Sequence, residues 1–244
     1  MAGPFFLVLR LAKRWGYLGQ AQSQSQLMAF DQQALAQYKE KLLIMASHAE
    51  GVVTRAVRAH LDRDEPLARQ ALETDEVIDQ FEIQIDRIAL GLLAQAPGEF
   101  ELRQVTCGMK IARELERVGD EATTIARRAV ELMALPPLAT PLDIAEMTFL
   151  ANAMLKDALD AFVSGNTVLA REVIPRDRRI DEMNKTYQDD LNGLMEASPE
   201  NIRRCRHLAV ISKCLERIAD HAKNVAEDAV LLHEAKDIRH AGSD

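Results

Sequence analysis

Two stretches of this sequence determine its fold class: LERVGDEATTIARRAV at Leu115–Val130 and LERIADHAKNVAEDAV at Leu215–Val230. In both, apolar residues recur every three or four positions, which is the period of an α-helix with one buried face. Both contain the acidic pattern E-x-x-x-D, and the second copy begins 100 residues after the first. A repeat of this length indicates that the chain contains two copies of one helical unit.

A second matched pair lies upstream of each of these stretches. LARQALETDEVIDQFE, from Leu67, aligns with LAREVIPRDRRIDEMN, from Leu169, and both carry the pattern D-x-x-x-D. The offset is 102 residues here, so the intervening loops differ by two residues. Pro175 stands where the first copy has Glu73. Because proline lacks a backbone N–H and crowds the preceding turn, we expect the helix to break or to begin afresh at this position.

Prolines and a Ser-Gly-Asn sequence divide the rest of the chain into periodic segments. We expect helices over 31–63, 65–95, 99–135, 141–164, 166–196 and 199–238. Ser198, followed by Pro199, predicts a capped start for the last of them. Long helices joined by short loops pack as antiparallel neighbours. The predicted fold is therefore all-α, with six long antiparallel helices in two tandem three-helix bundles.

Three parts of the chain follow from this division. Residues 1–27 are expected to be a poorly structured N-terminal extension, because Gln20–Gln26 reads QAQSQSQ and has no apolar pattern. The first three-helix repeat is expected over 28–137 and the second over 138–244.

Composition limits the functions that this chain can have. The 244 residues include 30 Lys and Arg against 38 Asp and Glu, a net charge of −8, which argues against nucleic-acid binding. No apolar run approaches the roughly 20 residues of a membrane-spanning helix. Three cysteines without a C-x-x-C pattern indicate reduced structural thiols and a cytoplasmic protein.

The repeated acids are the candidate functional residues. On a helical wheel, Glu116 and Asp120 lie about 40° apart, on the side opposite the apolar stripe. Glu216 and Asp220 lie in the same way on the last helix. Acids also form a row on one side of the helix over 65–95, namely Asp75, Asp79, Glu82 and Asp86, and their counterparts over 166–196 are Asp177, Asp181, Asn184 and Gln188. Like charges four residues apart cost a few tenths of a kcal/mol, so something should offset them. One interpretation is a solvated outer face with Arg and Lys ion pairs. The other is a site for Mg, Mn, Fe or Zn.

Catalytic patterns are much weaker than this acidic repeat. The chain has no Glu-x-x-His pair, no phosphate-cradling glycine loop and no recognisable acid–base pair. The predicted acidic sites lie on convex outer faces, where an enzyme would lack a pocket. His221, next to Asp220, is expected to be exposed. A metal-dependent helical-bundle enzyme is therefore the less favoured alternative.

The same repeat resembles the signature of the PhoU family. ERVGDEATTIARRAV and ERIADHAKNVAEDAV, each preceded by a D-x-x-x-D segment, carry the resemblance from Met28 to about Ile238. The resemblance implies eight metal-ligand positions, and all eight keep an acid here: Asp75, Asp79, Glu116, Asp120, Asp177, Asp181, Glu216 and Asp220. The chain departs from the family pattern in residues 1–27, in Pro175, and in the mismatch of Glu121 with His221.

The resemblance implies a cytoplasmic, non-enzymatic regulator of phosphate uptake. Such proteins link the ATPase subunit of the phosphate transporter to a sensor histidine kinase and restrain both transport and the starvation response when phosphate is plentiful. It also implies a homodimer, metal at the acidic motifs, and contact with the membrane only through partners. A helical interaction protein that binds no metal is the alternative.

Overall fold

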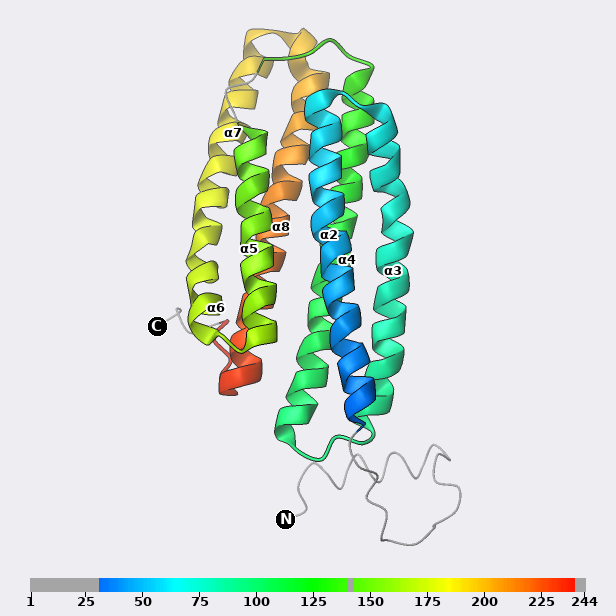
Figure 1. Ribbon diagram of the computed structural model, residues 1–244. Coiled ribbons are helices and arrows are strands. Elements are labelled where there is room, and N and C mark those ends of the chain that lie inside the picture. The colour runs from blue at the N-terminus through cyan, green and yellow to red at the C-terminus, as the bar shows by residue number, and fades with distance from the viewer. Residues whose placement is uncertain (1–30, 140–142, 240–244) are drawn as a thin grey trace, which may run out of the picture. The chain divides into compact units, whose positions relative to one another are not determined.

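The computed structural model describes residues 31–139 and 143–239, and these form α-helices, two short 3₁₀ turns and no strands (Figure 1). The first repeat contains α2 (Gln32–Asp62), α3 (Glu65–Leu93) and α4 (Glu99–Met133). The second contains α5 (Ile144–Ser164), α6 (Thr167–Val173), α7 (Asp177–Ala197) and α8 (Ile202–Glu234). The expected all-α fold with two tandem three-helix units is confirmed. The predicted extension over 1–27 lies outside the described residues.

Short polar residues set where several helices begin. Their side-chain oxygens accept hydrogen bonds of 2.9–3.1 Å from backbone N–H groups in the first turn. These caps are Asp31 for α2, Asp64 for α3, Asp143 for α5 and Asn166 for α6. Each cap typically contributes about 1 kcal/mol. Gly165 ends α5 at a φ of 73°, a conformation that favours glycine.

Proline acts as expected at one position and differently at another. Pro175 lies in a 3₁₀ turn, Ile174–Arg176, that separates α6 from α7, so the predicted break is confirmed. Pro199 opens a second 3₁₀ turn, Pro199–Asn201, before α8. Ser198 is the N-cap residue of this turn, as predicted, but its side chain makes no capping hydrogen bond, and α8 itself begins after Asn201. The tight turn already satisfies a backbone N–H, because Asn201 donates to the Ser198 carbonyl over 3.0 Å.

The helices lie in two layers (Figure 1). α3, α4, α8 and α7 lie side by side, and α2 and α5 pack on one face of that row and contact each other. α4 and α8, the two motif helices, are central neighbours and run antiparallel (Figure 1). We call the opposite face of the α3–α4–α8–α7 row the open face. On it, the side chains of Arg117 and Arg217 are 49% and 55% exposed.

Close packing inside the first repeat depends on glycine. Tyr38 of α2 is buried and its hydroxyl donates a 2.6 Å hydrogen bond to the Val105 carbonyl of α4. A Cβ atom at Gly108 would overlap this hydroxyl and lie 2.7 Å from Tyr38 Cε1. α4 therefore approaches α2 closely here only because residue 108 has no side chain.

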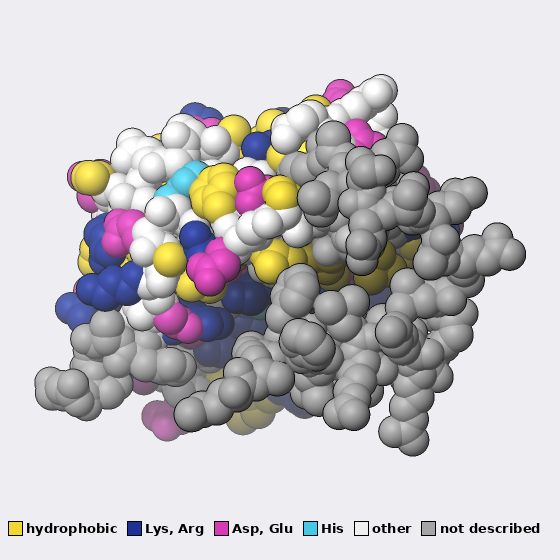
Figure 2. Space-filling model, turned by 90° about the horizontal axis from the view of Figure 1, so that it is seen from below, with side chains coloured by type: hydrophobic (Ala, Val, Ile, Leu, Met, Phe, Trp, Pro, Cys, Tyr) yellow, Lys and Arg dark blue, Asp and Glu magenta, His cyan; other side chains and the backbone are white. Residues whose placement is uncertain are grey.

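The lower end of the bundle has a mixed surface (Figure 2). Where described residues are visible, hydrophobic, acidic and basic side chains are interspersed there. Exposed apolar residues at helix ends include Phe100 of α4 and Val168 of α6. None of the helices within 31–139 and 143–239 is long and apolar enough to span a membrane.

Candidate acidic sites between neighbouring helices

The four acids of the first repeat meet where α3 packs on α4. A Cβ atom at Gly119 of α4 would lie 3.8 Å from Asp75 Oδ1 and 3.0 Å from Ile78 Cδ1, so this glycine allows α3 to approach closely. Burial raises the pKa of Asp75, and the charges of Asp79 and Asp120 raise it further. The influence of Asp120 on Asp75 shows that acids of the D-x-x-x-D and E-x-x-x-D motifs face each other across the contact of α3 with α4.

In the first site, Glu116 is largely enclosed and has two cationic neighbours. Its side chain is 16% exposed, and Oε2 is buried without a hydrogen-bond partner. Arg113 Nη1 and Arg117 Nε each lie 3.6 Å from that oxygen, which is within ion-pair distance only. Burial raises the pKa of Glu116, Asp120 raises it further, and the arginines act in the opposite direction.

The second repeat brings its four acids together between α7 and α8. Asp177 is 4% exposed; its Oδ2 accepts a 2.9 Å hydrogen bond from Lys223 Nζ, and its Oδ1 is buried without a partner. Glu216 is 9% exposed, and its Oε2 lies 2.6 Å from Lys213 Nζ at an angle outside that of a hydrogen bond. Burial raises the pKa of both Asp181 and Asp220, and the charges of Asp177 and Glu216 add to it.

The expectation that these acids lie on convex outer faces is wrong for Asp177 and Glu216. Both are buried, and Glu116 is largely so. A helical wheel gives the direction of a side chain relative to its own apolar stripe, but it does not show which neighbouring helix flanks that stripe. Glu116 lies on α4, which packs against α3, while Asp177 and Glu216 lie on α7 and α8, which pack against each other, and this packing removes water from the three side chains.

Carboxylate oxygens without hydrogen bonds are the kind of ligand that hard cations prefer. Glu116, Asp177 and Glu216 each offer one such buried oxygen at a predicted metal position. Within the described ranges, however, no group of three or more His, Cys, Asp or Glu side chains is already arranged to hold a metal ion. Single oxygens of suitable chemistry are therefore present, but they are not gathered around one point, and Arg113, Arg117 and Lys213 lie beside two of them.

A further polar network joins the two repeats across α4 and α8. Glu114 Oε2 lies 2.7 Å from His221 Nδ1 and accepts a 3.0 Å hydrogen bond from Asn224. Arg217 donates to Glu121 over 3.1 Å, again from one repeat to the other. His221 is 19% exposed, so the expectation of an exposed histidine is wrong. In the sequence, the only sign of this network is that Glu121 of the first repeat aligns with His221 of the second, so the two repeats differ at a position where both side chains make contacts between α4 and α8.

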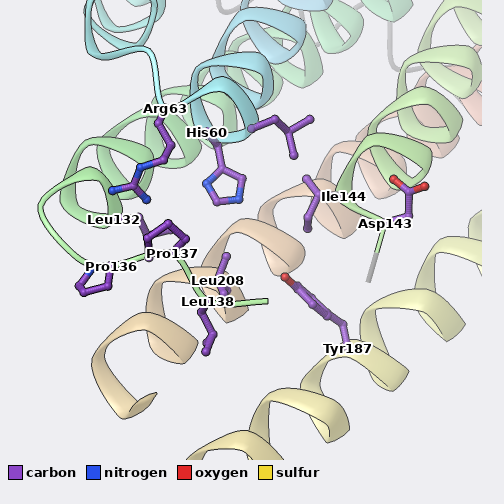
Figure 3. A pocket seen from close by; sticks show the side chains of 11 residues that line it. His60, Arg63, Leu132, Pro136, Pro137, Leu138, Asp143, Ile144, Tyr187 and Leu208 are labelled. Carbon is purple, nitrogen blue, oxygen red and sulfur yellow. The ribbon is translucent and has the colours of Figure 1, made fainter. Parts of the chain in front are cut away.

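A cavity of about 500 Å³ lies at the upper end of the bundle, beside the linker between the repeats (Figure 3). His60 and Arg63 of α2 line one side, and Tyr187 of α7 lies across from them (Figure 3). Arg63 Nη2 donates to the carbonyls of Met133 and Leu135 over 2.7 and 2.8 Å, which attaches the linker to α2. None of the predicted ligands lines this cavity.

Known proteins are similar to this chain in both sequence and fold. A family model described as the PhoU domain matches it twice, at residues 42–129 and 144–229, once in each repeat. A phosphate-specific transport system accessory protein PhoU homolog from Pseudomonas putida is 36% identical over 212 residues, covering 85% of this chain and 82% of the relative. The homolog from Aquifex aeolicus is 34% identical, covering 84% and 94%.

Two solved PhoU structures have the same fold as this chain. The crystal structure of PhoU from Pseudomonas aeruginosa superposes with a TM-score of 0.79 at 34% identity, covering 83% of this chain and 98% of that one. The phosphate transport system regulatory protein PhoU from Streptococcus pneumoniae also gives 0.79, at 27% identity, with coverages of 86% and 99%. The acidic motif occurs twice in the sequence, the three-helix unit occurs twice in the fold, and these relatives are matched over 82–99% of their length. The chain therefore belongs to the PhoU family.

Proposed function

We propose that this protein is a non-enzymatic regulator of phosphate uptake, acting in the cytoplasm as an adaptor between the ATPase subunit of a phosphate transporter and a sensor histidine kinase. The observation that carries the proposal is the match of both repeats to the PhoU domain, in relatives named as accessory or regulatory proteins of phosphate transport. The open face, with an acidic site on either side of α4 and α8, is the surface that we assign to partners.

The acidic sites have a structural role in this proposal. Metal of the Mg, Mn, Fe or Zn class would be held by Asp75, Asp79, Glu116 and Asp120 in one site and Asp177, Asp181, Glu216 and Asp220 in the other. When bound, it would neutralise the clustered carboxylates and brace α3 against α4 and α7 against α8. The three buried oxygens without hydrogen bonds support this assignment.

Metal analysis of purified variants tests the acidic sites. Replacing Asp79, Glu116 and Asp120 by Asn, Gln and Asn should lower the bound metal per chain, as measured by inductively coupled plasma mass spectrometry. A matched control changes three exposed acids outside both motifs to Gln: Glu40, Glu99 and Glu196. Unchanged metal content in the motif variant would support the alternative of a metal-free interaction protein. Arg113, Lys213 and Lys223, already beside motif acids, favour that alternative.

Affinity capture tests the adaptor function separately. The tagged chain would be recovered from phosphate-fed and phosphate-starved cells, and its partners identified by mass spectrometry. Recovery of a transporter ATPase or a sensor kinase, in amounts that change with phosphate, is the expected result. Recovery of neither under both conditions would refute the adaptor. Light scattering of the same preparation measures whether the protein is the homodimer that we propose.

A further inference from the structure

A basic groove runs along the contact of α4 and α8 near the N-terminal end of α8. It has a volume of about 630 Å³. Its charged lining consists of Arg128 from α4, Arg203, Arg206 and His207 from α8, and a single acid, Glu200. Three guanidinium groups stand there against the carboxylate of Glu200 and that of Glu131 at the edge, a local excess of positive charge in a chain whose net charge is −8. A local excess of this kind attracts anions.

Two of these arginines have no hydrogen bond or ion pair with the described residues, 31–139 and 143–239: Arg203 and Arg206. The charge of Arg203 does reach Glu131, whose pKa it helps to lower. The two arginines lie three residues apart, and His207 follows directly, so the three side chains emerge from one side of the first turns of α8. The backbone N–H groups at this end of α8 also favour negative charge.

The other two basic groups are held in place. Glu131 of α4 accepts a 2.7 Å hydrogen bond from Arg128 Nη1, and its Oε2 lies 3.0 Å from His207 Nδ1. This shared carboxylate fixes both groups at the edge of the groove, and Arg128 Nε remains buried without a partner. Burial lowers the pKa of His207; Glu131 opposes this, while Arg128, Arg203 and Arg206 all lower it. The lowered pKa favours the neutral, hydrogen-bonding form of His207, so the positive charge of the groove comes from its three arginines, and a bound anion would reduce the repulsion among them.

The groove continues along the same helix pair. Val210 lines both it and a neighbouring cavity of about 380 Å³, which contains Arg127, Lys213 and Arg217. Asp120 and Glu121 also line that second cavity, so the excess of positive charge is greatest at the Arg203 end. Basic groups are thus spread along a path on two helices, which suits an extended anion better than a single compact one.

We propose that this groove binds a linked phosphate anion, such as an inorganic polyphosphate or the triphosphate of a small molecule. The guanidinium group matches phosphate geometry with two parallel N–H donors, and linked phosphates reach several arginines at once. Pro199, Ile202 and Val210 form the apolar part of the lining. The proposal concerns direct binding by the purified protein and does not depend on the adaptor function.

Isothermal titration calorimetry with tripolyphosphate, at constant ionic strength, tests this assignment on the full chain. The variant is Arg203→Ala with Arg206→Ala, because both side chains lack internal partners and their removal should leave the fold intact. The control is Arg69→Ala with Arg87→Ala, two exposed arginines on α3 that change the net charge equally. We expect the affinity to fall at least about tenfold in the groove variant and to stay within about twofold in the control.

Three further measurements complete the test. Orthophosphate and sulfate should bind at least about tenfold more weakly than tripolyphosphate, because each reaches fewer arginines. Replacing the same two residues by Lys, which keeps the charge but not the paired donors, should give an intermediate affinity. Thermal unfolding by circular dichroism shows that each variant is folded. Absence of tripolyphosphate binding, equal losses in groove and control variants, or equal affinity for all three anions would overturn the proposal.

Discussion

Gly108 and Gly119 provide a matched pair of substitutions within one buried helix, α4. Replacing glycine by alanine inside a helix normally stabilises it by about 1 kcal/mol, because alanine has the better helix propensity. That gain is the same at both positions. Any difference between Gly108→Ala and Gly119→Ala therefore reports how closely the neighbouring helix approaches.

At Gly108 the new methyl group has no space. It would overlap the Tyr38 hydroxyl and lie 2.7 Å from Cε1 and 2.9 Å from Cζ of the same ring. The ring is 1% exposed and its hydroxyl donates to the Val105 carbonyl, so displacing it breaks a buried hydrogen bond. Overpacking costs about 1–3 kcal/mol and the lost hydrogen bond about 1–3 kcal/mol. After the helix gain, we expect a net loss near 3 kcal/mol.

At Gly119 the nearest atom is the Ile78 Cδ1 at 3.0 Å, the end of a flexible side chain. The second repeat already has Ala219 at the matching position, opposite Ile180. We therefore expect Gly119→Ala to change the free energy of unfolding by less than about 1 kcal/mol in either direction.

Thermal and urea unfolding followed by circular dichroism measure both effects. At about 2–4 °C per kcal/mol for a chain of this size, Gly108→Ala should lower Tm by about 6–12 °C and Gly119→Ala should shift it by less than about 4 °C. Adding Tyr38→Phe to Gly108→Ala removes the first overlapping atom and should recover part of the loss. Equal stability of the two single variants would refute this account of the helix packing.

Three other predictions follow from the polar groups. His221→Ala removes the imidazole beside Glu114 and leaves the half-buried carboxylate with Asn224 as its hydrogen-bond donor. Thermal unfolding at pH 7 should then show that the free energy of unfolding falls by about 1–2 kcal/mol. An unchanged Tm would contradict a role for this pair in joining the repeats. Asp220→Asn should stabilise the protein at neutral pH by roughly 0.5 kcal/mol. Because folding raises the pKa of Asp220, its charged form opposes folding above that pKa, so the advantage of Asn should disappear as the pH falls below the ordinary aspartate range. Burial raises the pKa of the Cys107 thiol to about 11, and the other two cysteines are also buried and have raised pKa values. A thiol reagent at pH 8 should therefore react slowly with the native protein, whereas all three thiols should react after denaturation. Fast reaction of the native protein would disprove the burial of the cysteines.

Much of the fold follows from the sequence because the signals are local and repeated. Helix periodicity, N-cap residues and proline act within a few residues, so the helix boundaries and the break at Pro175 are predictable from the chain alone. Because the sequence is repeated, the second half is predicted to form the same three-helix unit as the first. The sequence also places Glu116 and Asp120 on one side of α4 and identifies the PhoU family.

The tertiary structure alone decides how water, charge and neighbouring helices act on those residues. A helical wheel treats Glu116 and Glu216 alike, yet packing leaves one between two arginines and the other buried beside a lysine. The contacts of Glu114 with His221 and of Arg128 with Glu131 beside Arg203 depend on the antiparallel pairing of α4 with α8, and no local pattern encodes that pairing. Desolvation and cation clustering arise between helices that are distant in sequence, so these properties appear only once the two repeats are folded together.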